Sequence, residues 1–222
     1  MKPLLVEMTF DFICPWCLIG KRNLEKALGN LAKLRPDVSV ELRWKGVQLL
    51  PDLPAQGVPF MEFYLQRLGS EAMVRARQEQ VSEAAYHADV DVDLRRIVTM
   101  PNTANAHRLL ALATEQGSAR QVDALLERLF ASYFQRGEDL GSSELLLRVA
   151  RQCGFDPRNL EEALFDDGRP YVGRDAVPAN QAVPSFVIDN RPSLAGAQPS
   201  WLMLAQLQHA LERREATEAC LP

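Results

Sequence analysis

Two cysteines near the start of the chain, Cys14 and Cys17, enclose Pro15 and Trp16. Thiol–disulfide exchange requires a thiolate that attacks, a second thiol that resolves the mixed disulfide, and access for a partner. In a helix this spacing leaves Cys17 one turn beyond Cys14, within bridging distance. The unpaired N–H groups and the positive dipole end of such a helix stabilise negative charge on the Cys14 sulfur. The pattern therefore predicts Cys14 as the nucleophile, Cys17 as the resolving thiol and a redox-active Cys14–Cys17 disulfide.

The same C-x-x-C spacing also occurs in half of a structural zinc site, and such a pair can be chemically inert. A structural zinc site usually has a second pair of ligands. The chain has no other C-x-x-C, no C-x-x-H and no H-x-x-x-H, and its histidines, His87, His107 and His209, are scattered. We therefore favour redox chemistry and expect neither a metal site nor a tightly bound cofactor.

The elements around the cysteine pair support this interpretation. Residues 5–12 alternate apolar and polar side chains, which predicts a strand with one buried face. Pro15 is favoured at the first position of a helix, and an apolar stripe extends that helix to about residue 34. Residues 38–47 form a second alternating strand. A helical crossover between two such strands normally makes them parallel.

A long helical part follows. From about residue 60 to residue 165 the apolar side chains recur with helical period, most clearly over residues 122–134. Ser142 is a predicted N-cap, and Asp156–Pro157 combines a capping residue with a proline at the first helical position.

The C-terminal part returns to strands. Residues 184–188 and 193–196 are predicted strands around a turn, and an amphipathic helix with Trp201 on its apolar face follows. Thioredoxin-like sites place a cis-proline opposite the cysteine pair, just before a strand, where its neighbour offers backbone groups to a substrate. An ordinary proline at the first residue of a strand is the alternative. Because the C-P-W-C motif and this proline occur in the order of a thioredoxin-like site, we predict a cis peptide bond at Pro184 and substrate contacts at Val183 and Pro184.

The composition excludes several functional classes. The chain has 222 residues, of which 47% are hydrophobic, and its net charge of −4 gives no basic surface for nucleic acid. No apolar stretch approaches the roughly 18 residues of a membrane span, and the first apolar run ends at Glu7, too early for a signal peptide. Four cysteines are too few for a disulfide-stapled secreted scaffold. We expect a soluble, cytoplasmic protein with no nucleic-acid or membrane partner.

Four stretches carry a resemblance to a known family. They are residues 11–22 around C-P-W-C, Pro101-Asn102-Thr103 with Ala106-His107-Arg108, Val183-Pro184, and Gly196-Ala197-Gln198-Pro199. In this order, over nearly the full length, the sequence resembles the DsbA-like thioredoxin superfamily, specifically its cytosolic FrnE-type branch. One departure is the stretch 179–184, ANQAVP, where relatives often have glycines before the cis-proline.

The resemblance implies an α/β thioredoxin-like fold with a large all-helical insertion. It divides the chain into a discontinuous catalytic domain, residues 1–58 and 167–222, and an insertion domain, residues 59–166. The implied activity is dithiol–disulfide exchange with protein or small-molecule thiols and disulfides. It also suggests that Asn102 and His107 line the pocket above the cysteines. For His107, a packed or solvent-facing histidine is the stronger interpretation.

The same superfamily includes kappa-class glutathione transferases and 2-hydroxychromene-2-carboxylate isomerases. These relatives generally carry serine at the position of Cys14, and a serine and an acidic residue before the last helix bind the glutamyl end of glutathione. The corresponding residues here, Ala197 and Gln198, include no carboxylate. Both differences favour an oxidoreductase. A glutathione contact near Gln198 stays open, since a helix N-terminus can receive a carboxylate, and glutathione therefore stays open as a co-substrate.

Four further residues carry expectations, and two of them have two interpretations each. Asp11 is a candidate proton relay between the thiols, although a loop or capping hydrogen bond is the stronger interpretation. Trp16 is expected to be partly exposed, where it meets the partner. Cys153 lies on an apolar stripe and is expected to be buried. Cys220 is either an idle thiol near the C-terminus or a shuttle to Cys14.

Three functions compete at this point. A dithiol oxidoreductase is the first, a glutathione-dependent isomerase or transferase acting on an aromatic substrate is the second, and a chaperone that uses the helical insertion as an apolar surface is the third. The sequence determines neither the direction of exchange nor the oligomeric state.

Overall fold

A mixed four-stranded sheet forms the centre of the protein in a computed structural model, which describes residues 2–165, 167–173 and 182–219. Its strand order is β2-β1-β5-β6. The strands are β1 (Leu4–Phe10), β2 (Val40–Gly46), β5 (Ser185–Ile188) and β6 (Arg191–Ala195). The predicted parallel pairing of β1 and β2 is confirmed, and β5 pairs antiparallel with both β1 and β6.

Strand β1 lies in the interior of the sheet, and its burial extends beyond the predicted buried face. Its apolar face is buried as expected, but Glu7 and Thr9 on the other face are buried as well. The Glu7 carboxylate is 2.8 Å from the ammonium of Lys45 on β2, so its charge is paired. The predicted strongly buried face is therefore confirmed, and Glu7 and Thr9 on the opposite face are buried in addition in this interior strand.

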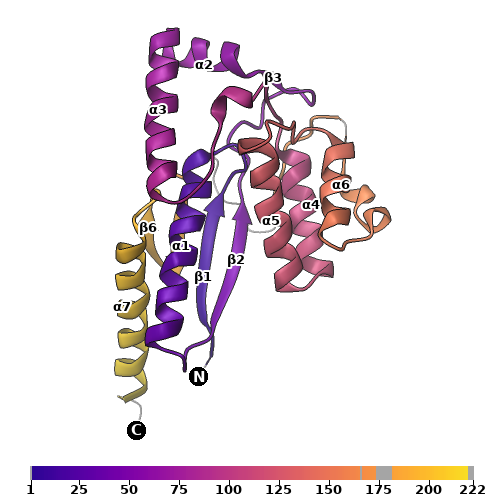
Figure 1. The fold of residues 1–222 in the computed structure, drawn as a ribbon. Coiled ribbons are helices and arrows are strands. Elements are labelled where there is room, and N and C mark those ends of the chain that lie inside the picture. Colours follow the sequence, from indigo (N-terminus) through magenta and orange to yellow (C-terminus); the bar gives the residue numbers. More distant parts are fainter. Residues whose placement is uncertain (1, 166, 174–181, 220–222) are drawn as a thin grey trace.

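Helices α1 (Pro15–Leu34) and α7 (Ser200–Ala219) lie side by side along the sheet (Figure 1). The limits of α1 agree with the sequence prediction. In α7 the buried residues are Met203, Leu207, Ala210 and Leu211. Trp201, predicted for this apolar face, is 69% exposed instead, because the stripe that meets α1 begins two residues later.

The insertion between β2 and β5 contains five α-helices and three short 3-10 turns among the described residues. The α-helices are α2 (Phe60–Leu68), α3 (Glu71–His87), α4 (Ala104–Gln116), α5 (Ala119–Phe134) and α6 (Ser143–Gln152), and the turns are η1 (Leu94–Arg96), η2 (Pro157–Asn159) and η3 (Glu161–Ala163). Ser142 caps α6 through a hydrogen bond from the Leu145 N–H, as predicted. Asp156 caps only the turn η2 and not the predicted longer helix.

The insertion also contains two short strands that the sequence did not indicate. β3 (Val58–Pro59) pairs antiparallel with β4 (Thr99–Met100). Each strand has two residues, too few for a period-two pattern to be visible. The insertion is thus helical apart from this ladder, and the predicted limits of the two domains stay a prediction.

The insertion helices occupy two places in the fold. Helices α2 and α3 lie beyond the end of the sheet where α1 begins, whereas α4, α5 and α6 lie together on the side of β2 (Figure 1). The predicted apolar face of α5 is buried over its whole length. The first group therefore stands above the start of α1, which carries the cysteine pair.

Candidate active site

The cysteine pair lies at the junction of β1 and α1. The backbone N–H of Cys14 donates to Asp11 O at 3.1 Å, which turns the chain out of the strand. Cys14 is the N-cap residue of α1, Pro15 occupies the first turn, and no side chain caps the helix. The Cys17 N–H donates to Cys14 O at 3.0 Å, so Cys17 follows one turn later. Both are free thiols. Cys14 lies at the N-terminal end of α1, as the sequence predicts.

The two thiols have different environments. Cys14 is 7% exposed and lines a cavity, whereas Cys17 is fully buried. Burial, together with a hydrogen bond to Cys14 and the charge of Cys14, raises the pKa of the Cys17 thiol well above its ordinary value. The negative charge of Asp11 acts in the same direction, and the Asp11 backbone N–H opposes it. Cys17 is thereby held as a neutral thiol behind Cys14.

The predicted cis-proline lies next to Cys14. The Val183–Pro184 peptide bond is cis, and the Cys14 sulfur is 3.9 Å from Val183 O. Gly20 on α1 permits this approach, because a Cβ at this position would lie 3.0 Å from Cγ of Pro184 and 3.3 Å from Phe186. The prediction of a cis bond is confirmed. The preceding residues 174–181, which include the first three residues of the stretch that departs from the family pattern, lie outside the described residues.

Asp11 is fully buried beneath the cysteine loop. Its Oδ2 accepts a hydrogen bond from the Leu49 N–H at 2.7 Å, and its Oδ1 is 3.0 Å from Nε2 of His107. The loop hydrogen bond favoured for Asp11 is thus confirmed, while its role as a proton relay stays a prediction. His107 is 2% exposed and stacks on Tyr171 at a ring distance of 5.1 Å. The stronger interpretation of His107, a packed histidine, is confirmed.

Asn102 holds the start of α4 to the loop that follows β2. Its side chain donates to Leu53 O at 2.6 Å and accepts from Gln48 at 2.8 Å and from the Ala104 N–H at 3.0 Å. Asn102 is 4% exposed. The structure therefore brings neither Asn102 nor His107 to the cavity over Cys14: Asn102 is hydrogen-bonded within the protein framework, and His107 is packed beneath it with its Nε2 on Asp11.

Gln198 lies in the turn between β6 and α7. Its side chain donates to Ala195 O at 2.7 Å, and its backbone O accepts from the Asn23 side chain on α1 at 3.0 Å. These contacts connect the turn to α1, and the predicted glutathione contact stays a prediction. Cys153 is half-buried, less than expected, because it follows the last turn of α6. Cys220 lies outside the described residues.

A cavity of about 750 Å³ opens over Cys14. Its walls come from the start of α1, the loop after β2, and helices α2 and α3, together with Leu94 and Met100; the lining side chains include Ile13, Trp16, Leu49, Leu50, Phe60, Phe63, Tyr64, Arg67, Val74, Arg77 and Val81. Trp16 is partly exposed, as predicted, and the Arg77 guanidinium lies 5.5 Å from the centre of its ring. Sequence reasoning missed Tyr64, Arg67 and Arg77, since no local motif marks them.

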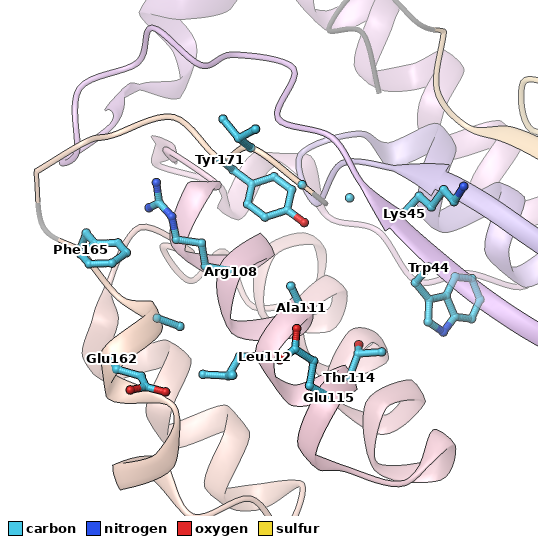
Figure 2. A pocket seen from close by; sticks show the side chains of 14 residues that line it. Trp44, Lys45, Arg108, Ala111, Leu112, Thr114, Glu115, Glu162, Phe165 and Tyr171 are labelled. Atoms are coloured by element: carbon cyan, nitrogen blue, oxygen red, sulfur yellow. The ribbon is translucent and has the colours of Figure 1, made fainter. Parts of the chain in front are cut away.

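A second cavity of about 590 Å³ lies away from the cysteines, between the end of β2, α4, residues 162–165 and residues 171–173. Figure 2 shows Arg108 and Glu115 of α4 beside it, with Tyr171 opposite Lys45. Its wall ends at Gly173, next to residues outside the described part. Within the described residues, no group of three or more metal-binding side chains is arranged around a common point, and no helix has the length and apolarity to cross a membrane.

Comparisons with known proteins agree with this geometry. Residues 5–211 match the family model of the DSBA-like thioredoxin domain. A Streptomyces coelicolor structure described as a probable DsbA oxidoreductase has a TM-score of 0.79 and 26% identity, covering 95% of this chain and 91% of that one. A 2-hydroxychromene-2-carboxylate isomerase shares the fold, with a TM-score of 0.57 and 15% identity, covering 96% of this chain and 98% of that one.

A relative in sequence points to the same family. The protein YwbO of Bacillus subtilis (strain 168), described as uncharacterized, is 23% identical over 199 residues, which is 86% of this chain and 90% of that protein. The family model covers almost all of the chain, from the first strand to the last helix, with the cysteine pair at the start of the first helix and the cis-proline beside it. The chain therefore belongs to the DSBA-like thioredoxin domain family.

Proposed function

We propose that the protein is a thiol–disulfide oxidoreductase in which Cys14 attacks and Cys17 resolves. The observation that carries this proposal is the asymmetry of the pair at the start of α1. Cys14 lines the cavity and lies at an uncapped helix N-terminus, whereas Cys17 is fully buried one turn behind it. A partner that enters the cavity meets the sulfur of Cys14 first.

The proposed exchange proceeds in two displacements. The Cys14 thiolate attacks one sulfur of a substrate disulfide, that S–S bond breaks, and one substrate thiolate leaves and takes a proton from solvent. Cys17 then loses its proton and attacks the Cys14 sulfur of the mixed disulfide, which releases the second substrate thiolate. The protein is oxidised to the Cys14–Cys17 disulfide, and the substrate is reduced to two thiols. The reverse sequence oxidises a dithiol.

The raised pKa of Cys17 suits this order of events. A neutral Cys17 does not compete with Cys14 for the substrate, because the thiolate is the nucleophile. Burial and the interactions with Cys14 are the main causes of the raised pKa. When Cys14 forms a mixed disulfide its charge disappears, so one of these causes is removed at the step in which Cys17 must ionise.

Likeness to oxidoreductases supports the proposal. The Streptomyces coelicolor structure, described as a probable DsbA oxidoreductase, matches over nearly the whole chain at 26% identity. The cis-proline beside Cys14 is in the place expected for thiol exchange, where Val183 presents its carbonyl at 3.9 Å from the sulfur. We include both protein and small-molecule thiols, glutathione among them, as candidate partners.

A trapping experiment tests the proposal. Cys17→Ser is expected to accumulate a mixed disulfide on Cys14 when the reduced protein meets a chromogenic disulfide, whereas Cys14→Ser is expected to accumulate none. Intact-protein mass spectrometry measures the adduct, and the released thiol is followed by absorbance. Equal adduct formation on both variants contradicts the assignment of roles. Catalysis that needs glutathione and survives Cys17→Ser would instead favour a glutathione-dependent isomerase or transferase.

A further inference from the structure

The cavity over Cys14 has an unusual balance of charge. Twenty of the described residues line it, and among these the only ionisable groups apart from the thiol of Cys14 and the phenol of Tyr64 are the guanidinium groups of Arg67 and Arg77. No aspartate or glutamate is among them. Most of the remaining lining is aliphatic or aromatic. The cavity therefore offers positive charge and apolar surface to a molecule that approaches Cys14.

The two arginines come from different helices and converge on one side chain. Arg67 is in the last turn of α2 and Arg77 is on α3. Burial and the charge of Cys14 raise the pKa of Tyr64, while Arg77 and Arg67 oppose this rise. Cys14, Tyr64 and the two arginines all line the same cavity, so the arginines and the sulfur face a common space.

Neither arginine is engaged by a carboxylate among the described residues. The Arg67 guanidinium lies over the ring of Phe63 at 5.6 Å. Arg77 lies over Trp16 and donates to the Gln80 side chain at 2.6 Å. By contrast, Arg75, two residues before Arg77 on α3, is paired with Glu71 at 3.1 Å. The charges of Arg67 and Arg77 are therefore available to an anionic ligand, and that of Arg75 is not.

The size of the site favours a small molecule over an unfolded polypeptide. A volume of about 750 Å³ falls within the roughly 300–1,000 Å³ typical of small-molecule pockets. Cys14 is only 7% exposed, and α2 and α3 form the wall above it. A cavity of this volume over a sulfur of such low exposure suits a disulfide on a short, flat group better than an extended polypeptide segment.

We propose that this cavity selects small disulfides that carry a carboxylate beside an aromatic or other apolar group, with Arg67 and Arg77 as the residues that determine the preference. The inference rests on the proposed exchange at Cys14. The reaction is the first displacement described above: the Cys14–sulfur bond forms, the substrate S–S bond breaks, and an anionic aromatic thiolate leaves. The disulfide itself is the oxidant.

Three disulfides of different charge test the preference. Dithiobis(nitrobenzoate) is aromatic with a carboxylate on each ring, dithiodipyridine is aromatic and neutral, and cystamine is cationic. Single-turnover rates are measured with the reduced full-length protein and divided by the rates of a simple monothiol, which removes the intrinsic reactivity of each disulfide. We expect the normalised rate to be highest for the dianion and to fall with added salt.

The variants assign the preference to particular residues. Arg67→Gln and Arg77→Gln are each expected to lower the normalised rate with the dianion by about fivefold, the size of a favourable exposed ion pair. Their rates with dithiodipyridine are expected to change less than about twofold by the same reasoning. Arg75→Gln removes the same charge two residues from Arg77, outside the cavity lining, and is expected to leave all three rates unchanged.

The outcomes separate the two proposals. Equal normalised rates for all three disulfides, or an effect of Arg75→Gln as large as that of Arg77→Gln, overturn the inference and leave the exchange function intact. A disulfide-bonded peptide that reacts faster than the dianion after normalisation overturns it in favour of a polypeptide substrate. Failure of the wild-type protein to react with any disulfide overturns the proposed function itself.

Discussion

Gly46, the last residue of β2, offers a sharp test of the packing around His107, the residue that contacts Asp11 beneath the cysteine pair. A Cβ at this position would lie 2.3 Å from Nδ1 of His107 and 3.1 Å from two carbons of the same ring. Contacts below 3.0 Å are essentially never seen for real Cβ atoms. Replacement of Gly46 by alanine therefore requires either the imidazole or the end of β2 to move.

The imidazole has little room to move. His107 is 2% exposed, and the rings of Phe12 and Tyr171 lie 4.9 and 5.1 Å from it. To regain an ordinary contact of about 3.4 Å, the ring or the strand must shift by roughly 1 Å. A shift of this size strains the 3.0 Å contact between His107 and Asp11 or the aromatic packing. Hydrogen bonds to charged groups contribute about 1.5–3 kcal/mol and overpacking costs about 1–3 kcal/mol.

Gly46→Ala is accordingly expected to lower the free energy of unfolding by about 2–4 kcal/mol, measured by urea unfolding of the reduced protein. Gly29→Ala is the matched control, because nothing lies within 4 Å of a Cβ there. In the interior of α1 this change is expected to stabilise the protein by about 0.5–1 kcal/mol. In a His107→Ala background, the cost of Gly46→Ala is expected to fall below about 1 kcal/mol, since the ring is gone.

An equal cost of Gly46→Ala in both backgrounds would refute this reasoning, because the strain would then not involve the imidazole. A change as harmless as Gly29→Ala would refute it as well. The double-mutant cycle separates these cases from a general loss of β-strand stability, which both backgrounds share.

Two further predictions concern charge and protonation. Lys21 on α1 is 1% exposed and binds Glu127 of α5 at 2.9 Å. Lys21→Met is expected to cost about 1–3 kcal/mol in urea unfolding, because its half-buried carboxylate partners lose a cation. A cost below that of the exposed control Arg75→Met would contradict this. The raised pKa of Cys17 makes the free energy of unfolding depend on pH. The unfolded thiol ionises near its ordinary pKa of 9.0, while the folded one stays neutral. The contribution of Cys17 to the free energy of unfolding is therefore complete below pH 9 and is lost as the pH rises toward the folded pKa. Relative to Cys17→Ser, the reduced protein is expected to lose about 1.4 kcal/mol per pH unit above 9, and a flat difference would contradict the raised pKa.

Features set by neighbours in sequence were predictable. The order strand, C-P-W-C, helix depends on an alternating pattern and a proline within about thirty residues, and the observed α1 begins at Pro15 and ends at Leu34 as expected. The N-cap at Ser142 depends on a hydrogen bond three residues along the chain. The cis-proline was predicted only in combination with the cysteine motif, because Pro184 alone has no local signature.

Features that join distant segments were not predictable in the same way. Asp11 and His107 are 96 residues apart, and only the fold brings them to 3.0 Å. The ladder of β3 and β4 is too short for periodicity to reveal. Trp201 fitted the apolar stripe of its helix in the sequence, yet the register of α7 against α1 leaves it exposed. Arg67 and Arg77 look like ordinary surface residues until the cavity is seen.

The proposed chemistry and the proposed selectivity of the site thus come from different parts of the chain. Cys14, Cys17 and the cis-proline belong to the sheet and its first helix, and in the proposed mechanism they carry the exchange with any disulfide that reaches the sulfur. Arg67 and Arg77 belong to α2 and α3 of the insertion, which form the wall of the cavity above that sulfur. Because the arginines stand on other elements than Cys17 and Pro184, changes in the charge of this wall are expected to alter the choice of partner and leave the reaction with a neutral disulfide intact. A protein in which Arg67→Gln and Arg77→Gln together abolished exchange with dithiodipyridine would show that the wall takes part in the chemistry and not only in the selection.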